Sequence, residues 1–159
     1  MDVVRISLLD VLVALAVLAL LAYVLVPAHA DAPAVLASPT LTPGALNPDV
    51  TQPTIGATIC LKGWTATVRP PVEYTNALKA EQMKQYGETG PPSAYQEDHL
   101  ISLELGGNPT DPRNLWPEPY PRAADVDRIE NELNAKVCAG ELSLADAQDR
   151  ESRLKHEHG

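Results

Sequence analysis

Basic residues and cysteines are both scarce in this sequence, and each shortage limits what the chain can be. Lys and Arg total 12 against 21 Asp and Glu, so the formal net charge is −9. Basic side chains supply most non-specific affinity for nucleic-acid phosphates, so this composition disfavours a broad phosphate-binding surface. A local basic patch could compensate, and five residues are available for it: Lys62, Arg69, Lys79, Lys84 and Arg113. The two cysteines lack partners at zinc-ligand spacing, which argues against a zinc site.

The first thirty residues have the pattern of a secretory signal peptide. Arg5 precedes an apolar run over residues 11–26, and Ala28-His29-Ala30 has the small-x-small form of a signal peptidase site. We therefore expect cleavage before Asp31 and a secreted or periplasmic protein without stable membrane association. The alternative is a membrane anchor over residues 6–26, although the uninterrupted apolar run is slightly short for a span.

Residues 31–58 are rich in proline and small polar residues, and they contain few large apolar side chains. Such a segment buries too little surface to offset its ordering entropy, so we expect a disordered linker. The folded domain is then expected over residues 59–150, followed by a charged, frayed tail over residues 151–159.

Cys60 and Cys138 lie near opposite ends of this expected domain. An even number of cysteines in an exported protein favours a disulfide, and a domain of this size benefits from a covalent cross-link. Closing so long a loop stabilises the fold by roughly 4 to 5 kcal/mol in the chain-entropy account. Two buried free thiols are the alternative.

Helices are predicted on both sides of the central part of the domain. Periodicity and capping residues predict a helix that begins at Thr75 or Asn76 and ends at Tyr86, and a second over residues 123–139. Ser143, with Asp146 three residues later, predicts the start of a last helix. Short strands are expected at residues 59–61 and 65–68.

The central stretch, YQEDHLISLELGGNPTDPRNLWP, begins at residue 95 and ends at residue 117. It places Asp98 and His99 at the head of an alternating run over residues 101–105, which predicts a half-buried strand. Gly106 and Gly107 end that strand, a proline-containing loop follows, and order resumes at Asn114 before an extended spacer over residues 117–121. Since neighbouring strand residues point to opposite faces, Asp98 and His99 can share one site only if the strand bends or bulges.

Asp-His, Gly-Gly and Asn-Leu in this order resemble the core of the HNH, or ββα-metal, nuclease motif. The similarity extends over residues 59–148 through the pieces CLKGWTATVRPP, EDHLISLELGG, DPRNLWPEPY and ENELNAKVCAGELSLADAQ. These pieces resemble a group of exported bacterial HNH-like proteins. The resemblance implies an α+β domain with a small ββα-metal core, flanking helices and, from the cysteines, one disulfide.

The resemblance also implies roles for four residues around one divalent cation, Mg²⁺ or a similar ion. His99 matches the general base that takes a proton from the attacking water, and Asp98 matches the acidic metal ligand beside it. Asn114 matches the position that orients the catalytic loop through backbone hydrogen bonds. Asn134 is the expected third position, a metal ligand on the following helix, although its spacing from Asn114 is longer than in the compact form of the motif.

The implied function is metal-dependent hydrolysis of phosphodiester bonds in DNA or RNA outside the cytoplasm. Nucleic acid is then the substrate, and the oligomeric state is left open. The alternative is a non-catalytic exported module that keeps the HNH-like scaffold and binds a protein or an envelope component. The acidic net charge favours this alternative.

Overall fold

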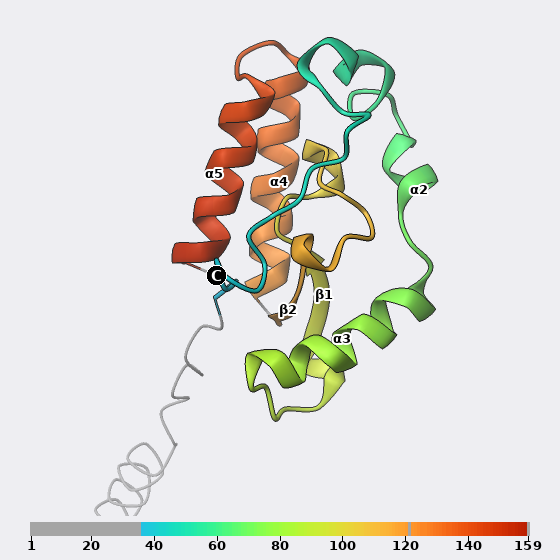
Figure 1. Cartoon of the computed structure of the whole chain (residues 1–159). Helices are drawn as coiled ribbons and strands as arrows, with labels where there is room; N and C mark the ends of the chain where they lie inside the picture. Colours follow the sequence, from blue (N-terminus) through green and yellow to red (C-terminus); the bar gives the residue numbers. More distant parts are fainter. Residues whose placement is uncertain (1–35, 121, 159) are drawn as a thin grey trace, which may run out of the picture. The chain divides into compact units, whose positions relative to one another are not determined.

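The computed structural model describes residues 36–120 and 122–158. The expected signal peptide, its cleavage site and residues 31–35 lie outside the described residues. The described part has an α+β fold in which an antiparallel hairpin, β1 (Tyr95–His99) and β2 (Leu115–Pro119), is followed by two long helices. These helices, α4 (Arg122–Cys138) and α5 (Leu144–Glu157), lie side by side in Figure 1.

The hairpin differs in its limits from the sequence prediction. Its register runs regularly from the Tyr95–Pro119 pair to the His99–Leu115 pair, so Asp98 and His99 end a strand instead of beginning one. The proposed extended spacer is in fact largely β2, whose prolines are tolerated because a two-stranded sheet has only edge strands.

The predicted strand over residues 101–105 is wrong. A 3₁₀ turn over Leu103–Leu105 takes its place, and the left-handed φ of 78° at Gly106 ends that turn. The apolar residues alternate, but Ser102 between them is buried as well, at 4% exposed. Because Ser102 is buried like its apolar neighbours, the segment lacks the alternating solvent face of a half-buried strand, and the alternation does not indicate a strand here.

Helices α4 and α5 confirm the predicted positions of the two C-terminal helices. The side chain of Ser143 caps α5 by accepting a hydrogen bond from the Asp146 amide at 3.1 Å. The prediction of a frayed tail over residues 151–159 is wrong, because α5 continues to Glu157. Glu151 and Lys155 extend the buried stripe of this helix and are both 0% exposed, so their charges must be balanced inside the protein.

Residues 36–58 are packed onto the domain, so the prediction of a disordered linker is wrong for this part. The Ala37 amide bonds the Lys155 carbonyl at 3.1 Å, and Leu46 forms a β-bridge with Gly107. Val50 enters the main core next to the 3₁₀ helix over Gln52–Ala57. Isolated apolar residues and main-chain hydrogen bonds, neither of which has a sequence period, hold this segment.

The segment between this N-terminal arm and the hairpin is helical. Residues 59–61 form turns instead of a strand, and the second predicted strand is the short helix α2 (Trp64–Val68). Helix α3 (Val72–Tyr86) begins directly after Pro71, earlier than predicted, and ends as predicted with a left-handed Gly87. Proline at the N-cap ends the preceding extended segment and allows the helix to start there.

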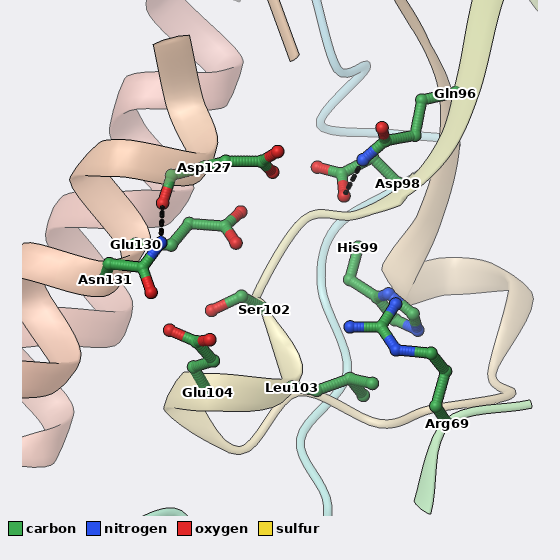
Figure 2. A pocket seen from close by; sticks show the side chains of 10 residues that line it. All are labelled: Arg69, Gln96, Asp98, His99, Ser102, Leu103, Glu104, Asp127, Glu130 and Asn131. Carbon is green, nitrogen blue, oxygen red and sulfur yellow. Dashed lines mark hydrogen bonds between the residues drawn. The ribbon is translucent and has the colours of Figure 1, made fainter. Parts of the chain in front are cut away.

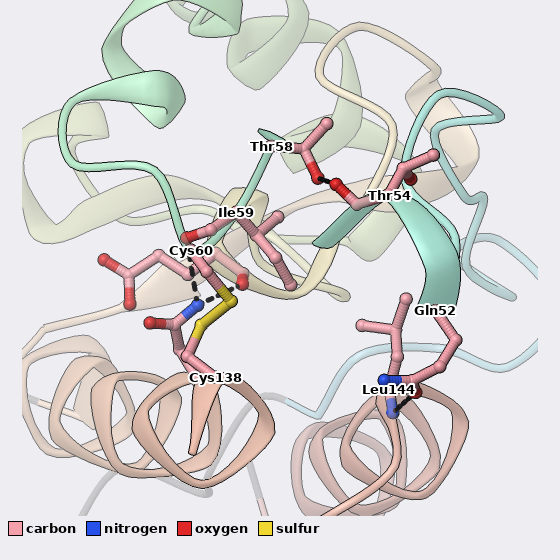
Figure 3. The surroundings of a disulfide bond; sticks show 9 residues. Gln52, Thr54, Thr58, Ile59, Cys60, Cys138 and Leu144 are labelled. Carbon is pink, nitrogen blue, oxygen red and sulfur yellow. Dashed lines mark hydrogen bonds between the residues drawn. A yellow bond between two sulfur atoms is a disulfide. The ribbon is translucent and has the colours of Figure 1, made fainter. Parts of the chain in front are cut away.

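The predicted disulfide between Cys60 and Cys138 is present, and no free cysteine occurs in the described residues. It joins the segment before α2 to the last residue of α4, across a sequence separation of 78 residues (Figure 3). Leu133 and Val137 of α4 pack into the main core beside it. None of the helices in the described ranges has the length and apolar content that crossing a bilayer requires.

Candidate metal-binding active site

A polar cavity of about 300 Å³ lies where the end of β1 faces the first half of α4 (Figure 2). Asp98 and His99 reach it from β1, and Asp127 and Glu130 reach it from α4. Ser102, Leu103 and Glu104, which follow the strand, also line it. The site therefore lies at the end of the strand rather than on one face of it.

This position explains how Asp98 and His99 share one cavity without a bulge. Their pairs with Trp116 and Leu115 are regular, so the predicted bend inside the strand is not found. The chain leaves the sheet immediately after His99 and turns through Ser102 along the cavity wall. Both side chains are nearly buried, with 8% of Asp98 and 5% of His99 exposed.

The His99 imidazole is held by one ring nitrogen. Its Nε2 lies 3.1 Å from the carbonyl oxygen of Pro109, and since a carbonyl can only accept, Nε2 must carry the proton. Nδ1 of the neutral ring then keeps its lone pair. Burial lowers the pKa of His99, which favours the neutral form, although the Asp98 charge opposes this effect. A neutral imidazole with a free Nδ1 is suited to accept a proton.

Asn114 is completely buried and fixes the loop between the two strands. Its side-chain oxygen accepts from the Ile101 amide at 3.0 Å, and its amide nitrogen donates to the carbonyls of Ile101 at 2.9 Å and Asn108 at 3.0 Å. A Cβ atom at Gly107 would overlap the Ile101 carbonyl oxygen, so the second glycine of the Gly-Gly pair is sterically required. Asn114 thus makes the backbone hydrogen bonds that the resemblance to the HNH motif implies for its position.

Asn134 is not among the residues that line the cavity with Asp98. Its amide nitrogen donates to the Glu104 carbonyl at 2.7 Å and the Ile59 carbonyl at 3.4 Å, and it lines a separate hollow near the disulfide. The prediction of Asn134 as a metal ligand therefore needs correction. It lies about two helical turns beyond Asp127, so its side chain reaches the loop backbone instead.

Three carboxylates form a group that could hold a metal ion. Each of Asp98, Asp127 and Glu130 offers an oxygen, and the three oxygens lie within 4.8 Å of one another. Asp127 and Glu130 were not predicted as ligands. Their i, i+3 spacing on the polar line of α4 was the available signal, because residues so spaced share one side of a helix. Hard carboxylate oxygens fit Mg²⁺, Mn²⁺ or Ca²⁺.

Lys155 of α5 neutralises this group from its buried side. Its Nζ donates to Asp98 Oδ2 at 2.8 Å, to Glu130 Oε1 at 2.6 Å and to the backbone carbonyl of His99. The carboxylate of Glu151 adds an ion pair at 3.4 Å. Lys155 was missed in the sequence because a frayed tail was expected there. A Glu-Lys pair at i, i+4 in line with Leu144 and Ala147 was the available signal.

The buried charges change the ionisation of the acidic groups. Burial is the largest single effect on the pKa of Asp98 and raises it, but the charge and the hydrogen bond of Lys155, with smaller effects of His99 and Glu118, together hold the pKa of that carboxyl below its usual value. Burial raises the pKa of Glu130 and of Glu118 on β2 to about 9 each, and the neighbouring Asp98 charge adds to both shifts. In the metal-free protein at neutral pH, Asp98 is therefore ionised and these two glutamates are protonated.

Basic side chains do not converge on the cavity as a patch. Arg69 is the one Lys or Arg that lines it, and its guanidinium lies beside His99 in Figure 2. The other four candidates lie elsewhere: Lys62 lines the hollow near the disulfide, Lys79 bonds the Tyr95 carbonyl, Lys84 pairs with Glu81, and Arg113 pairs with Asp111. The compensating basic patch is thus reduced to one exposed arginine.

No protein-family model, curated protein or solved structure matches this chain. The features of the site therefore have to carry the functional argument by themselves.

Proposed function

We propose that this protein is a metal-dependent nuclease of the HNH type, acting on phosphodiester bonds of DNA or RNA outside the cytoplasm. The observation that carries the proposal is the position of His99. Its ring is neutral, its Nε2 is bonded to the Pro109 carbonyl, and it shares one cavity with Asp98, Asp127 and Glu130. A base beside a group of hard ligands is an arrangement that supports metal-assisted hydrolysis of a phosphodiester.

Asp98, Asp127 and Glu130 are the residues that would hold a divalent cation. Such an ion supplies charge stabilisation at the phosphate and at the leaving oxygen. The carboxyl group of Glu130 would lose its proton on binding, because ligands coordinate in their deprotonated form. The Lys155 ammonium leaves Asp98 Oδ1 and Glu130 Oε2 as the oxygens not bonded to it.

The remaining side chains of the cavity have separate roles. His99 accepts the proton of the attacking water at Nδ1, since Nε2 is already protonated. Arg69 pairs with a substrate phosphate, for which a guanidinium offers two parallel donors. Asn114 fixes the backbone on both sides of the loop, which keeps the Pro109 carbonyl under the imidazole.

A non-catalytic binding module is the second candidate, and the charge of the cavity favours it. Four carboxylates, those of Asp98, Glu104, Asp127 and Glu130, line the cavity against one arginine. An acidic wall repels a polyanion unless a cation is bound. In this second case the site binds a metal ion but does not cleave nucleic acid.

An assay of the secreted protein on supercoiled plasmid and on RNA, with Mg²⁺, Mn²⁺ or EDTA, tests the proposal. His99→Ala should lower the cleavage rate by about 10²- to 10⁴-fold, as is typical when a general base is removed. His156→Ala is the matched control, because the Nε2 of His156 also lies near a backbone carbonyl, that of Thr42, at 3.0 Å. The control should cleave at the wild-type rate. Metal-independent degradation, or full activity of His99→Ala, would exclude the proposed mechanism.

A further inference from the structure

Lys155 is a completely enclosed charged side chain beside the site, with 0% of its surface exposed. We propose that it is a positioning residue, which selects the carboxylate oxygens that Asp98 and Glu130 turn toward a divalent cation. This inference rests on the proposed metal site. Lys155 is not among the residues lining the cavity, so it acts through the groups it bonds.

The ammonium has three protons and three hydrogen-bonded acceptors. These are Asp98 Oδ2, Glu130 Oε1 and the backbone carbonyl of His99. One side chain of α5 thus joins the end of β1, where the base lies, to the helix that provides two of the three carboxylates. No other residue in the described parts of the chain is bonded to all three groups.

The same hydrogen bonds leave the second oxygen of each carboxylate for the cavity. Asp98 Oδ1 accepts a long bond, 3.3 Å, from the Gln96 amide, and Figure 2 shows the Asp98 carboxylate directed toward that of Asp127. A carboxylate that is fixed at one oxygen presents the other in a defined direction. Ligands fixed in this way lose less entropy when they bind a metal ion.

Simple charge balance is the competing explanation for Lys155, and Glu151 allows the two to be separated. Glu151 is also 0% exposed, lies 3.4 Å from the ammonium and accepts a hydrogen bond from the Ser102 amide at 3.0 Å. Glutamine at this position keeps an oxygen for the Ser102 amide but removes the charge. Lys155→Met together with Glu151→Gln therefore removes the buried ammonium and one of the carboxyl groups that face it, whereas Glu151→Gln alone removes only that carboxyl group.

The experiment compares the double variant with Glu151→Gln alone in the full chain. The probe is Mn²⁺, with affinity measured by isothermal titration calorimetry at constant ionic strength and folding checked by circular dichroism and thermal melting. If Lys155 positions the carboxylates, the double variant should fold and should bind Mn²⁺ at least tenfold more weakly than Glu151→Gln. Wild-type protein should bind Mn²⁺ as tightly as Glu151→Gln does.

The other outcomes overturn the inference in distinguishable ways. Equal affinity of the two variants would reduce Lys155 to charge balance, and tighter binding by the double variant would mean that its charge only repels the metal. A double variant that does not fold would show that Lys155 serves the fold as a whole. Absence of Mn²⁺ binding by wild-type protein would overturn the proposed metal site itself.

Discussion

The two halves of α4 face different environments. The first half carries Asp127 and Glu130 toward the polar cavity, where Glu130 accepts a hydrogen bond from Lys155, and it also contributes the completely buried Ala123 and Val126. The second half carries Leu133 and Val137 into the main hydrophobic core and ends at the Cys138 disulfide. One helix thus joins the hydrophobic core and the disulfide to a group of three acidic side chains.

The difference teaches how a small domain can keep three acidic groups close together. Like charges within 4.8 Å repel, and burial raises the pKa of two of the three, Glu130 and Asp127. Apolar packing holds both halves of α4 in place, through Ala123 and Val126 in the first half and Leu133 and Val137 in the second, and the disulfide also fixes the second half. Changes to the disulfide or to the contacts of the second half should therefore affect stability, and changes to the carboxylates of the first half should affect metal binding.

The largest effect is expected from removing the disulfide at the end of α4. Replacing Cys60 and Cys138 by serine should lower the free energy of unfolding by about 4 kcal/mol, because the unfolded chain regains the freedom of a long loop. Urea unfolding of wild-type and variant protein measures this loss. Protein that remains folded should keep its Mn²⁺ affinity, and a selective loss of metal binding would break the proposed division of α4.

A smaller effect, on metal affinity and not on stability, is expected from Asp127→Asn in the first half of α4. The side chain is exposed and belongs to the carboxylate group, so the change removes a charged ligand without opening a cavity. We expect the affinity for Mn²⁺ to fall about tenfold, or about 1.4 kcal/mol, with the unfolding free energy changed by less than about 0.5 kcal/mol. An unchanged affinity would remove Asp127 from the ligand set.

Asn134→Ala is the counterpart in the second half of the same helix. It removes the hydrogen bonds to the carbonyls of Glu104 and Ile59 and should cost about 1 kcal/mol of stability. Mn²⁺ affinity should remain that of wild type. The variants Asp127→Asn and Asn134→Ala thus test directly whether the two halves of α4 differ in function. Weaker metal binding by Asn134→Ala would restore the ligand role predicted from the sequence.

A further effect concerns the pH dependence of stability through Glu118. Burial raises its pKa from 4.5 to about 9, so between these values the folded protein binds a proton that the unfolded chain has released. Its contribution to stability therefore decreases as pH rises through this window. Glu118→Gln cannot titrate, so in EDTA its melting temperature should fall less between pH 6 and pH 9 than that of wild type. An equal fall in both proteins would contradict the buried, protonated state.

Local signals predicted a large part of the fold. The periodicity of α4, the Ser143 cap of α5 and the Gly87 end of α3 all depend on residues a few positions apart, and each was located from the sequence. The cysteine pair was also predicted correctly. The strand over residues 101–105 was not, because the polar Ser102 is buried together with the alternating apolar residues of an irregular segment.

The site was predicted only where its residues are neighbours in the sequence. Asp98 and His99 adjoin, and Asn114 follows in the same motif, so the order of residues alone indicated their association. Asp127 and Glu130 line the cavity, and Asn134 does not, because the spacing between hairpin and helix decides which turn of α4 meets β1. Sequence periodicity defines the face of a helix but not how far the helix is shifted along its axis.

The sequence by itself thus determined α4, α5 with its Ser143 cap, the Gly87 end of α3, the disulfide pairing and the proximity of Asp98 to His99. Only the tertiary structure decided that Lys155 lies against Asp98, 57 residues away, and that residues 36–58 belong to the domain. The reason is the range of the forces involved. Helical hydrogen bonds and caps act within a few residues, whereas a buried ion pair depends on desolvation and on contacts that exist only once distant segments have packed.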